Sequence, residues 1–99
     1  MNNVVKTIIE QIGGNRAFAM IGAKNVIFSD DSLHVKFPGA GKGWPNKFVI
    51  RYDAGSDDYR VEFWRVGRVN FKPMGEFAGV YADQLVELIE SKTGLYLSL

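Results

Sequence analysis

The sequence of 99 residues contains no cysteine and only one histidine. Without cysteine, the chain cannot form a disulfide bridge, a thiolate zinc site or a thiol nucleophile. The single imidazole, at His34, lacks the neighbouring residues that are typical of a metal site or of nucleophilic catalysis. We therefore expect a non-enzymatic protein with no catalytic residues, no metal site, no cofactor and no small-molecule substrate.

Long apolar runs and targeting signals are also missing. The longest apolar stretch, residues 17–21, is far shorter than the roughly 20 residues that cross a bilayer, so we expect no membrane partner. Residues 1–6 lack the basic start and apolar run of a secretory signal, which predicts a cytoplasmic protein. The length is enough for one two-layer core, so residues 1–99 are expected to form a single domain.

The apolar residues follow two different periods along the chain. Helical spacing predicts a helix over about residues 3–13 and another over about residues 81–93. Residues 16–21 fit either a short helical turn or the start of a strand. A period of two in the middle of the chain predicts four strands, at about residues 25–28, 33–37, 47–52 and 59–64.

The pairing of these strands can be predicted from the side on which each apolar residue lies. Aspartate-rich segments at 29–32 and 53–58 are typical of turns, and they lack the spacing of a calcium-binding loop. Each segment therefore closes a hairpin. The register that keeps the apolar side chains on one face pairs Val26 with Val35, Phe28 with Leu33, Phe48 with Phe63, Ile50 with Val61 and Tyr52 with Tyr59.

A fifth strand over about residues 68–73, ended by its proline, is predicted after a three-residue loop. Such a loop needs a left-handed residue at its end, and Gly67 stands there. The resulting register directs Val69 and Phe71 toward the core and Arg68 and Lys72 outward.

Together these elements predict an α+β protein. It would be a curved five-stranded antiparallel meander with N- and C-terminal helices packed on one face, in the order α-β-β-β-β-β-α. Both helices carry an apolar stripe, and the sheet has one apolar face for them to cover. The other face of the sheet, called the open face below, is left for solvent or for a partner.

The net charge of +1 hides an uneven distribution. Residues 34–72 contain eight lysines and arginines against four acids, whereas residues 73–99 contain one lysine against four acids. The predicted register places Glu62 on the open face as its only acid, together with Trp64. The cations expected there are Lys36, Lys47, Arg51, Arg60, Arg68 and Lys72, with His34 beside them.

Cations beside an exposed aromatic side chain on an antiparallel sheet are typical of surfaces that bind phosphates and stack bases. A polar open face is also explained by solvation alone and by the protection of edge strands.

A glycine-rich loop, residues 38–46, joins the second and third predicted strands. The pair Gly41-Lys42 suggests a phosphate-binding loop, but Lys36 stands where that motif needs its first glycine, and no serine or threonine follows. Nucleoside triphosphate binding is therefore excluded. Lys42 and Trp44 lie near the tip of this loop, where Trp44 either contacts a base or a partner, or folds down over the end of the core.

Residues 12–25, which begin Ile-Gly-Gly-Asn-Arg, and residues 81–96, which begin Tyr-Ala-Asp-Gln-Leu, resemble small proteins of bacteriophages and mobile elements. The resemblance covers most of the chain. It implies a short phage-encoded protein that acts in the bacterial host cytoplasm and binds nucleic acid or a host protein. It carries over no catalytic residues.

Two hypotheses of function follow. The first is a DNA-binding protein that holds a single strand rather than a duplex, because no basic helix is available for a major groove. The second is a protein-interaction module, either a homodimer or a binder of a phage or host protein, that acts through an edge strand or the apolar carboxyl-terminal tail. The residues expected to bind nucleic acid are Lys36, Lys42, Trp44, Lys47, Arg51, Arg60, Trp64, Arg68 and Lys72.

Overall fold

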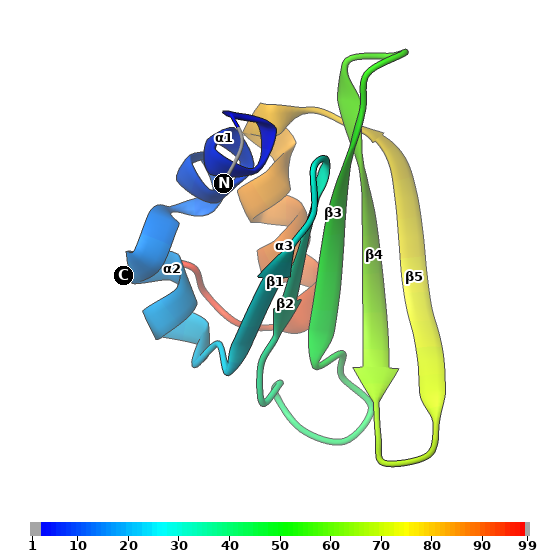
Figure 1. Ribbon diagram of the computed structural model, residues 1–99. Helices are drawn as coiled ribbons and strands as arrows, with labels where there is room; N and C mark the ends of the chain where they lie inside the picture. The colour runs from blue at the N-terminus through cyan, green and yellow to red at the C-terminus, as the bar shows by residue number, and fades with distance from the viewer. Residues whose placement is uncertain (1–2, 99) are drawn as a thin grey trace.

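The computed structural model describes residues 3–98 and shows one antiparallel sheet with helices gathered on one side of it (Figure 1). The predicted α+β class is confirmed, and so are the five antiparallel strands. The elements along the chain are α1 (Asn3–Ile12), α2 (Gly14–Ile21), β1 (Asn25–Phe28), β2 (Ser32–Lys36), β3 (Lys47–Asp53), β4 (Asp58–Val66), β5 (Phe71–Val80), the 3₁₀ helix η1 (Ala82–Gln84) and α3 (Leu85–Thr93).

The sheet is a simple meander in the order β1-β2-β3-β4-β5, so β1 and β5 are its edge strands. All five strand pairings predicted for the first four strands are confirmed. The register was predictable because one set of alternating side chains is apolar and the other is polar. A slip by one residue would exchange the two faces and expose the whole apolar set.

The core lies between the helices and the apolar face of the sheet. Side chains from α1 and α3, such as Ile8 and Ile89, join Phe48 and Val61 in one buried cluster. Residues 16–21, which the sequence left open, belong to α2, whose Ala17 and Ile21 enter the same cluster. The helical part of the protein therefore has three α-helices, one more than the sequence predicted.

The prediction for the fifth strand is wrong in register and in extent. Val66 pairs with Phe71, so the loop has four residues, Gly67–Asn70, and is closed by a hydrogen bond from the Gly67 amide to the Asn70 carbonyl (2.8 Å). Gly67 does not take a positive φ, so the left-handed position required by the shorter loop does not exist. Because the loop is longer by one residue, the register of the strand changes.

The inward residues of β5 are therefore not the predicted ones. Val69 is 85% exposed and Phe71 is 69% exposed, whereas Val80 is buried and Phe77 packs edge-on against Phe63. The strand also continues past Pro73 to Val80, with a register shift between its pairings at Pro73 and Gly75. Proline is tolerated there because β5 is an edge strand, where no outer neighbour needs its amide.

The carboxyl-terminal tail folds back onto the domain. Leu97 is 2% exposed, and its amide donates a hydrogen bond to the Glu90 carboxylate (2.9 Å). Helix α3 ends at Gly94, which has a φ of 71°. Within residues 95–98, Leu97 is thus buried in the domain and Leu95 partly buried, whereas Tyr96 is exposed.

Candidate nucleic-acid interface

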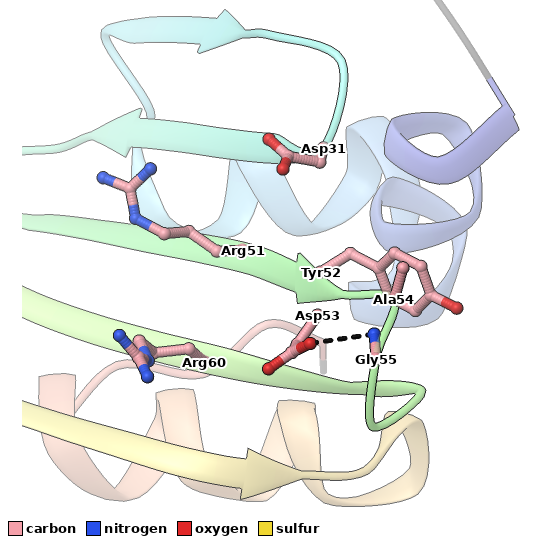
Figure 2. Close-up of a pocket in the computed structure, with 7 residues that line it drawn as sticks. All are labelled: Asp31, Arg51, Tyr52, Asp53, Ala54, Gly55 and Arg60. Atoms are coloured by element: carbon pink, nitrogen blue, oxygen red, sulfur yellow. Dashed lines mark hydrogen bonds between the residues drawn. The ribbon is translucent and has the colours of Figure 1, made fainter.

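The register of the sheet decides which of the predicted residues share the open face. All five of Lys36, Lys47, Arg51, Arg60 and Trp64 lie on it, as predicted, because each is out of phase with the residues of its strand that enter the core cluster. Ser32 and Val49 share the parity of the open face but are buried. In Figure 2, which looks onto this face with the helices behind the strands, the arginine side chains of β3 and β4 extend side by side.

The structure does not bring the other four predicted residues onto this face. Lys72 pairs with Arg65 and so has the parity of the apolar face, as a consequence of the longer loop. Arg68 lies in the exposed β4–β5 loop, and Lys42 lies exposed in the glycine-rich loop.

Trp44 lies at the end of the core, against the end of α3. A Cβ atom on Gly94 would come within 3.0 Å of its ring atom Cζ3, so the indole packs directly on this glycine. Trp44 thus folds down onto Gly94, while 43% of its surface stays exposed and it lies outside the buried core cluster. Trp44 therefore does not lie on the open face.

The prediction that Glu62 is the only acid on the open face is also wrong. Asp53 and Asp58 end the two central strands with the parity of Arg51 and Arg60, and Glu76 pairs with Glu62 from β5. The four strands β2 to β5 therefore carry four cations and four acids on this face. The open face as a whole therefore carries no excess of positive charge.

The charges are instead separated along the strands. The β1–β2 and β3–β4 turns lie at one end of the sheet, and the glycine-rich loop and the β4–β5 loop lie at the other (Figure 1). The first end carries five aspartates: Asp30, Asp31, Asp53, Asp57 and Asp58. The second end, called the basic end below, has no acid on its strands or loops and carries seven cations: Lys24, Lys36, Lys42, Lys47, Arg65, Arg68 and Lys72.

The two arginines of the open face are already paired. Arg51 Nε donates to the Glu62 carboxylate at 2.9 Å, and Arg60 lies 3.4 Å from Glu76. They border a shallow hollow of about 510 Å³ whose lining also includes Asp31 and Asp53 (Figure 2). Phosphate binding at this end would compete with internal ion pairs and would bring the ligand close to aspartates.

The two lysines of the open face are not paired in this way. Lys36 and Lys47 are direct partners across β2 and β3. Within residues 3–98, neither ammonium group makes an ion pair. Directly opposed like charges destabilise a sheet. The structure therefore keeps two neighbouring positive charges together without a carboxylate to neutralise them.

Trp64 lies next to this lysine pair, because its direct partner on β3 is Lys47. Its indole Nε1 donates to Glu62 Oε1 at 3.1 Å, and Arg51 occupies the other oxygen of that carboxylate. Partial burial alone would raise the pKa of Glu62, but these two hydrogen bonds lower it below its ordinary value. Glu62 thus stays ionised near neutral pH and fixes the orientation of the indole ring.

A second hollow, of about 270 Å³, lies on the open face at the basic end. Its lining comes from four strands: Asn25, Ile27, His34, Lys36, Lys47 and Val66. Strands β1 and β4 are not neighbours, yet both border it, so the open face is concave there. Ile27 and Val66 border the hollow from β1 and β4, and the lysine pair lies on the two strands between them.

His34 lies in this hollow and is sensitive to its surroundings. Partial burial, followed by the charges of Lys47 and Arg51, lowers the pKa of His34 below 6.5, and Glu62 opposes this shift only weakly. Because the unfolded chain then takes up the proton more readily, the free energy of unfolding should fall as the pH drops below about 6.5.

We expect this pH dependence to belong to one side chain, because the chain has only one histidine. Denaturant unfolding of the wild type and of His34→Gln between about pH 8 and about pH 5 measures it. The variant should lose the dependence in this range and keep only the losses at lower pH that come from carboxylates such as Glu62. An unchanged slope in the variant would show that His34 is not the group responsible.

The prediction from sequence missed three apolar residues at the basic end: Ile27, Val66 and Phe71. Ile27 is 57% exposed on the edge strand, and Phe71 faces Val66 across β4 and β5. The alternation of β1 did indicate that Ile27 points away from the core. No comparable signal was available for Phe71, because its face depends on the length of the preceding loop.

Comparison with protein-family models, curated protein sequences and solved structures found no match to this chain. The resemblance to small phage proteins therefore stays a hypothesis. Within residues 3–98, no group of three histidine, aspartate or glutamate side chains is placed to hold a metal ion. None of the helices in that part of the chain is long and apolar enough to cross a membrane.

Proposed function

We propose that the protein binds single-stranded DNA in the cytoplasm, without catalysis and without a cofactor, at the basic end of its open sheet face. The observation that carries this proposal is the Lys36–Lys47 pair, which no carboxylate of residues 3–98 neutralises and which lies beside the partly exposed Trp64. The lysines would contact phosphates and the indole would stack on a base.

The lysine pair supports a polyanionic ligand for an energetic reason. Two like charges in direct cross-strand contact reduce stability, and an acid at either position would remove this repulsion. Phosphates bound by the two ammonium groups, one at each, give the same relief only in the complex, and their binding releases the counterions condensed on the DNA. The pair is therefore unfavourable in the free protein and favourable in the bound one.

The shape of the site supports a single strand. A duplex presents its bases stacked inside grooves, which are usually read by a helix or a two-stranded ribbon. Here the cations lie on a concave sheet face beside an aromatic ring and line a hollow together with Ile27 and Val66. A base has to leave its stack to reach such a surface, which single strands allow at low cost.

The test is a fluorescence titration of Trp44→Phe, in which Trp64 is the only indole. We expect oligothymidine to quench its emission at low salt, whereas a duplex of equal length should bind more weakly. If about four phosphates are engaged, a fourfold rise in salt should lower the affinity roughly 50-fold. Oligouridine as a further ligand measures the preference for DNA. Absence of binding to any oligonucleotide at low salt would refute the proposal.

A second candidate function, homodimerisation, is favoured by the free edge of β1. This strand has no neighbour on its outer side within the described chain, and Ile27 and Phe28 are both about half exposed. A dimer that persists at high salt in gel filtration, and that Ile27→Asp converts to a monomer, would support this candidate.

A further inference from the structure

We propose that Phe71 is a second base-stacking residue of the interface and that it acts together with Trp64. This inference rests on the proposed function and deepens it, because it names the residue that extends the site onto the β4–β5 hairpin. The sequence assigned Phe71 to the core, and the four-residue loop moves it to the opposite face.

The position of Phe71 follows from its pairing. Its partner Val66 borders the hollow that also contains His34 and Lys47, so both members of the pair lie on the open face. Trp64 is two residues before Val66 on the same strand and has the same parity. Phe71 and Trp64 are therefore diagonal neighbours on one face of a two-stranded ribbon.

Phe71 is unusually exposed for a side chain of its kind. It keeps 69% of its surface accessible, and Pro73, the next residue of the same parity, is also exposed. With Trp64 and Val66 they make a continuous apolar patch at the end of the hairpin. Contiguous apolar surface of this kind marks a contact site, whereas scattered exposed residues do not.

The charges around the patch favour a polyanion as its occupant. Arg68 lies in the loop before Phe71, and Lys47 is the β3 partner of Trp64. Lys72 follows Phe71 in the chain but has the parity of the other face. The strands and loops at this end of the sheet carry no acid. The carboxylate that contacts Trp64, that of Glu62, is already paired with Arg51. An apolar patch with these cations beside it matches a ligand with phosphates outside and flat bases inside.

The spacing of the two rings indicates the form of the strand that fits. Diagonal neighbours on a ribbon are roughly 7–8 Å apart. Bases in a stacked strand repeat at about 3.4 Å, so adjacent stacked bases cannot each cover one ring. A strand that places adjacent bases on Trp64 and Phe71 must be extended between them, which a single strand allows and a duplex does not.

The test compares Phe71→Ala with Tyr96→Ala, which removes an aromatic ring of equal exposure (70%) from the tail. Stacking on one base predicts that Phe71→Ala weakens oligothymidine binding roughly 5- to 150-fold, with an unchanged salt dependence. Phe71→Trp should retain the affinity, and Tyr96→Ala should bind as the wild type does. Because Phe71 is largely exposed, its removal should leave the fold intact, which circular dichroism checks.

An abasic oligonucleotide of the same length separates stacking from other causes. Wild type and Phe71→Ala should bind it equally, because no base is present to stack. If Phe71→Ala binds oligothymidine as tightly as Tyr96→Ala while charge reversal at Lys36 and Lys47 weakens it, the inference fails and the proposed function stands. If the wild type binds no oligonucleotide, the proposed function fails first. Binding of phosphatidylserine vesicles that depends on Phe71, without any oligonucleotide effect, would also overturn the inference.

Discussion

Reversing both charges of the cross-strand lysine pair, in Lys36→Glu/Lys47→Glu, should weaken binding of single-stranded DNA about 50-fold or more at low salt. Each lysine is assigned one phosphate, and each lost contact on a single strand removes about 0.7 from the slope of log affinity against log salt. The salt dependence should therefore become shallower by about 1.4. Oligonucleotide titrations over a range of salt concentrations measure both quantities.

The matched control is Lys6→Glu/Arg16→Glu, which changes the net charge by the same amount on exposed positions of α1 and α2. It should cost much less affinity, because the helices lie on the other side of the sheet (Figure 1). Equal losses in the two double variants would mean that overall charge, rather than the open face, attracts DNA, and would contradict the proposed site.

The single variant Lys36→Glu should affect stability and DNA binding in opposite directions. It converts the like-charge pair with Lys47 into an opposite-charge pair, so the free energy of unfolding should rise by about 0.2–1 kcal/mol. The affinity for DNA should fall in the same protein. A variant that is more stable but binds less well is expected where a residue serves binding at the expense of stability.

The second large effect is expected at Asn46, which joins the glycine-rich loop to β4. Its side chain is nearly buried, accepts a hydrogen bond from the Val66 amide (2.7 Å) and donates one to the Val66 carbonyl (3.0 Å). Its backbone amide also donates to the Trp64 carbonyl (2.9 Å). One residue before β3 begins, Asn46 thus continues the ladder and holds the end of β4 where Trp64 and Val66 lie.

Asn46→Ala should lower the free energy of unfolding by about 2–4 kcal/mol, because it removes two hydrogen bonds and leaves both backbone groups of Val66 without these partners. For a chain of this size this corresponds to a fall of roughly 10–25 °C in Tm. Asn25→Ala is the control, since Asn25 is exposed on β1 and its loss should cost less than about 0.5 kcal/mol. A Tm of Asn46→Ala close to that of the control would contradict this assignment.

The sequence was most informative where the two faces of an element differ strongly in polarity. Leu33 and Val35 alternate with His34 and Lys36, and the observed pairing of β2 with β1 and β3 has the parity that buries the first pair and leaves the second on the open face. Helix α3 was predictable for a similar reason, because apolar residues recur at helical spacing until Gly94.

The same reasoning failed at the β4–β5 hairpin. Val69 and Phe71 alternate with polar residues, and the predicted loop length was chosen to bury them. Alternation shows that a strand has two different faces, but it does not show that anything covers the apolar one. Here Phe71 faces the open side and Val69 lies in the loop, so burial had to come from Phe77 and Val80 further along β5.

The candidate site was predicted in part. Lys36, Lys47 and Trp64 share a face because they occupy one parity of paired strands, and the sequence determines parity. Arg51 and Arg60 have the same parity, but their ion pairs with Glu62 and Glu76 depend on neighbours that only the assembled sheet supplies. Trp44 could not be placed at all, because its contact with Gly94 joins segments fifty residues apart in the chain.

By itself, the sequence determined the α+β class, the register of the first four strands and the exclusion of thiol chemistry. These properties follow from composition and from local periodicity. Only the tertiary structure decided the length of the last hairpin loop, the positions of Trp44 and Phe71, and the separation of charge along the strands. Each of these depends on contacts between distant segments, where one added residue in a loop exchanges the faces of a strand. The near-neutral net charge proved compatible with a basic site because the sheet places its lysines at one end and its aspartates at the other.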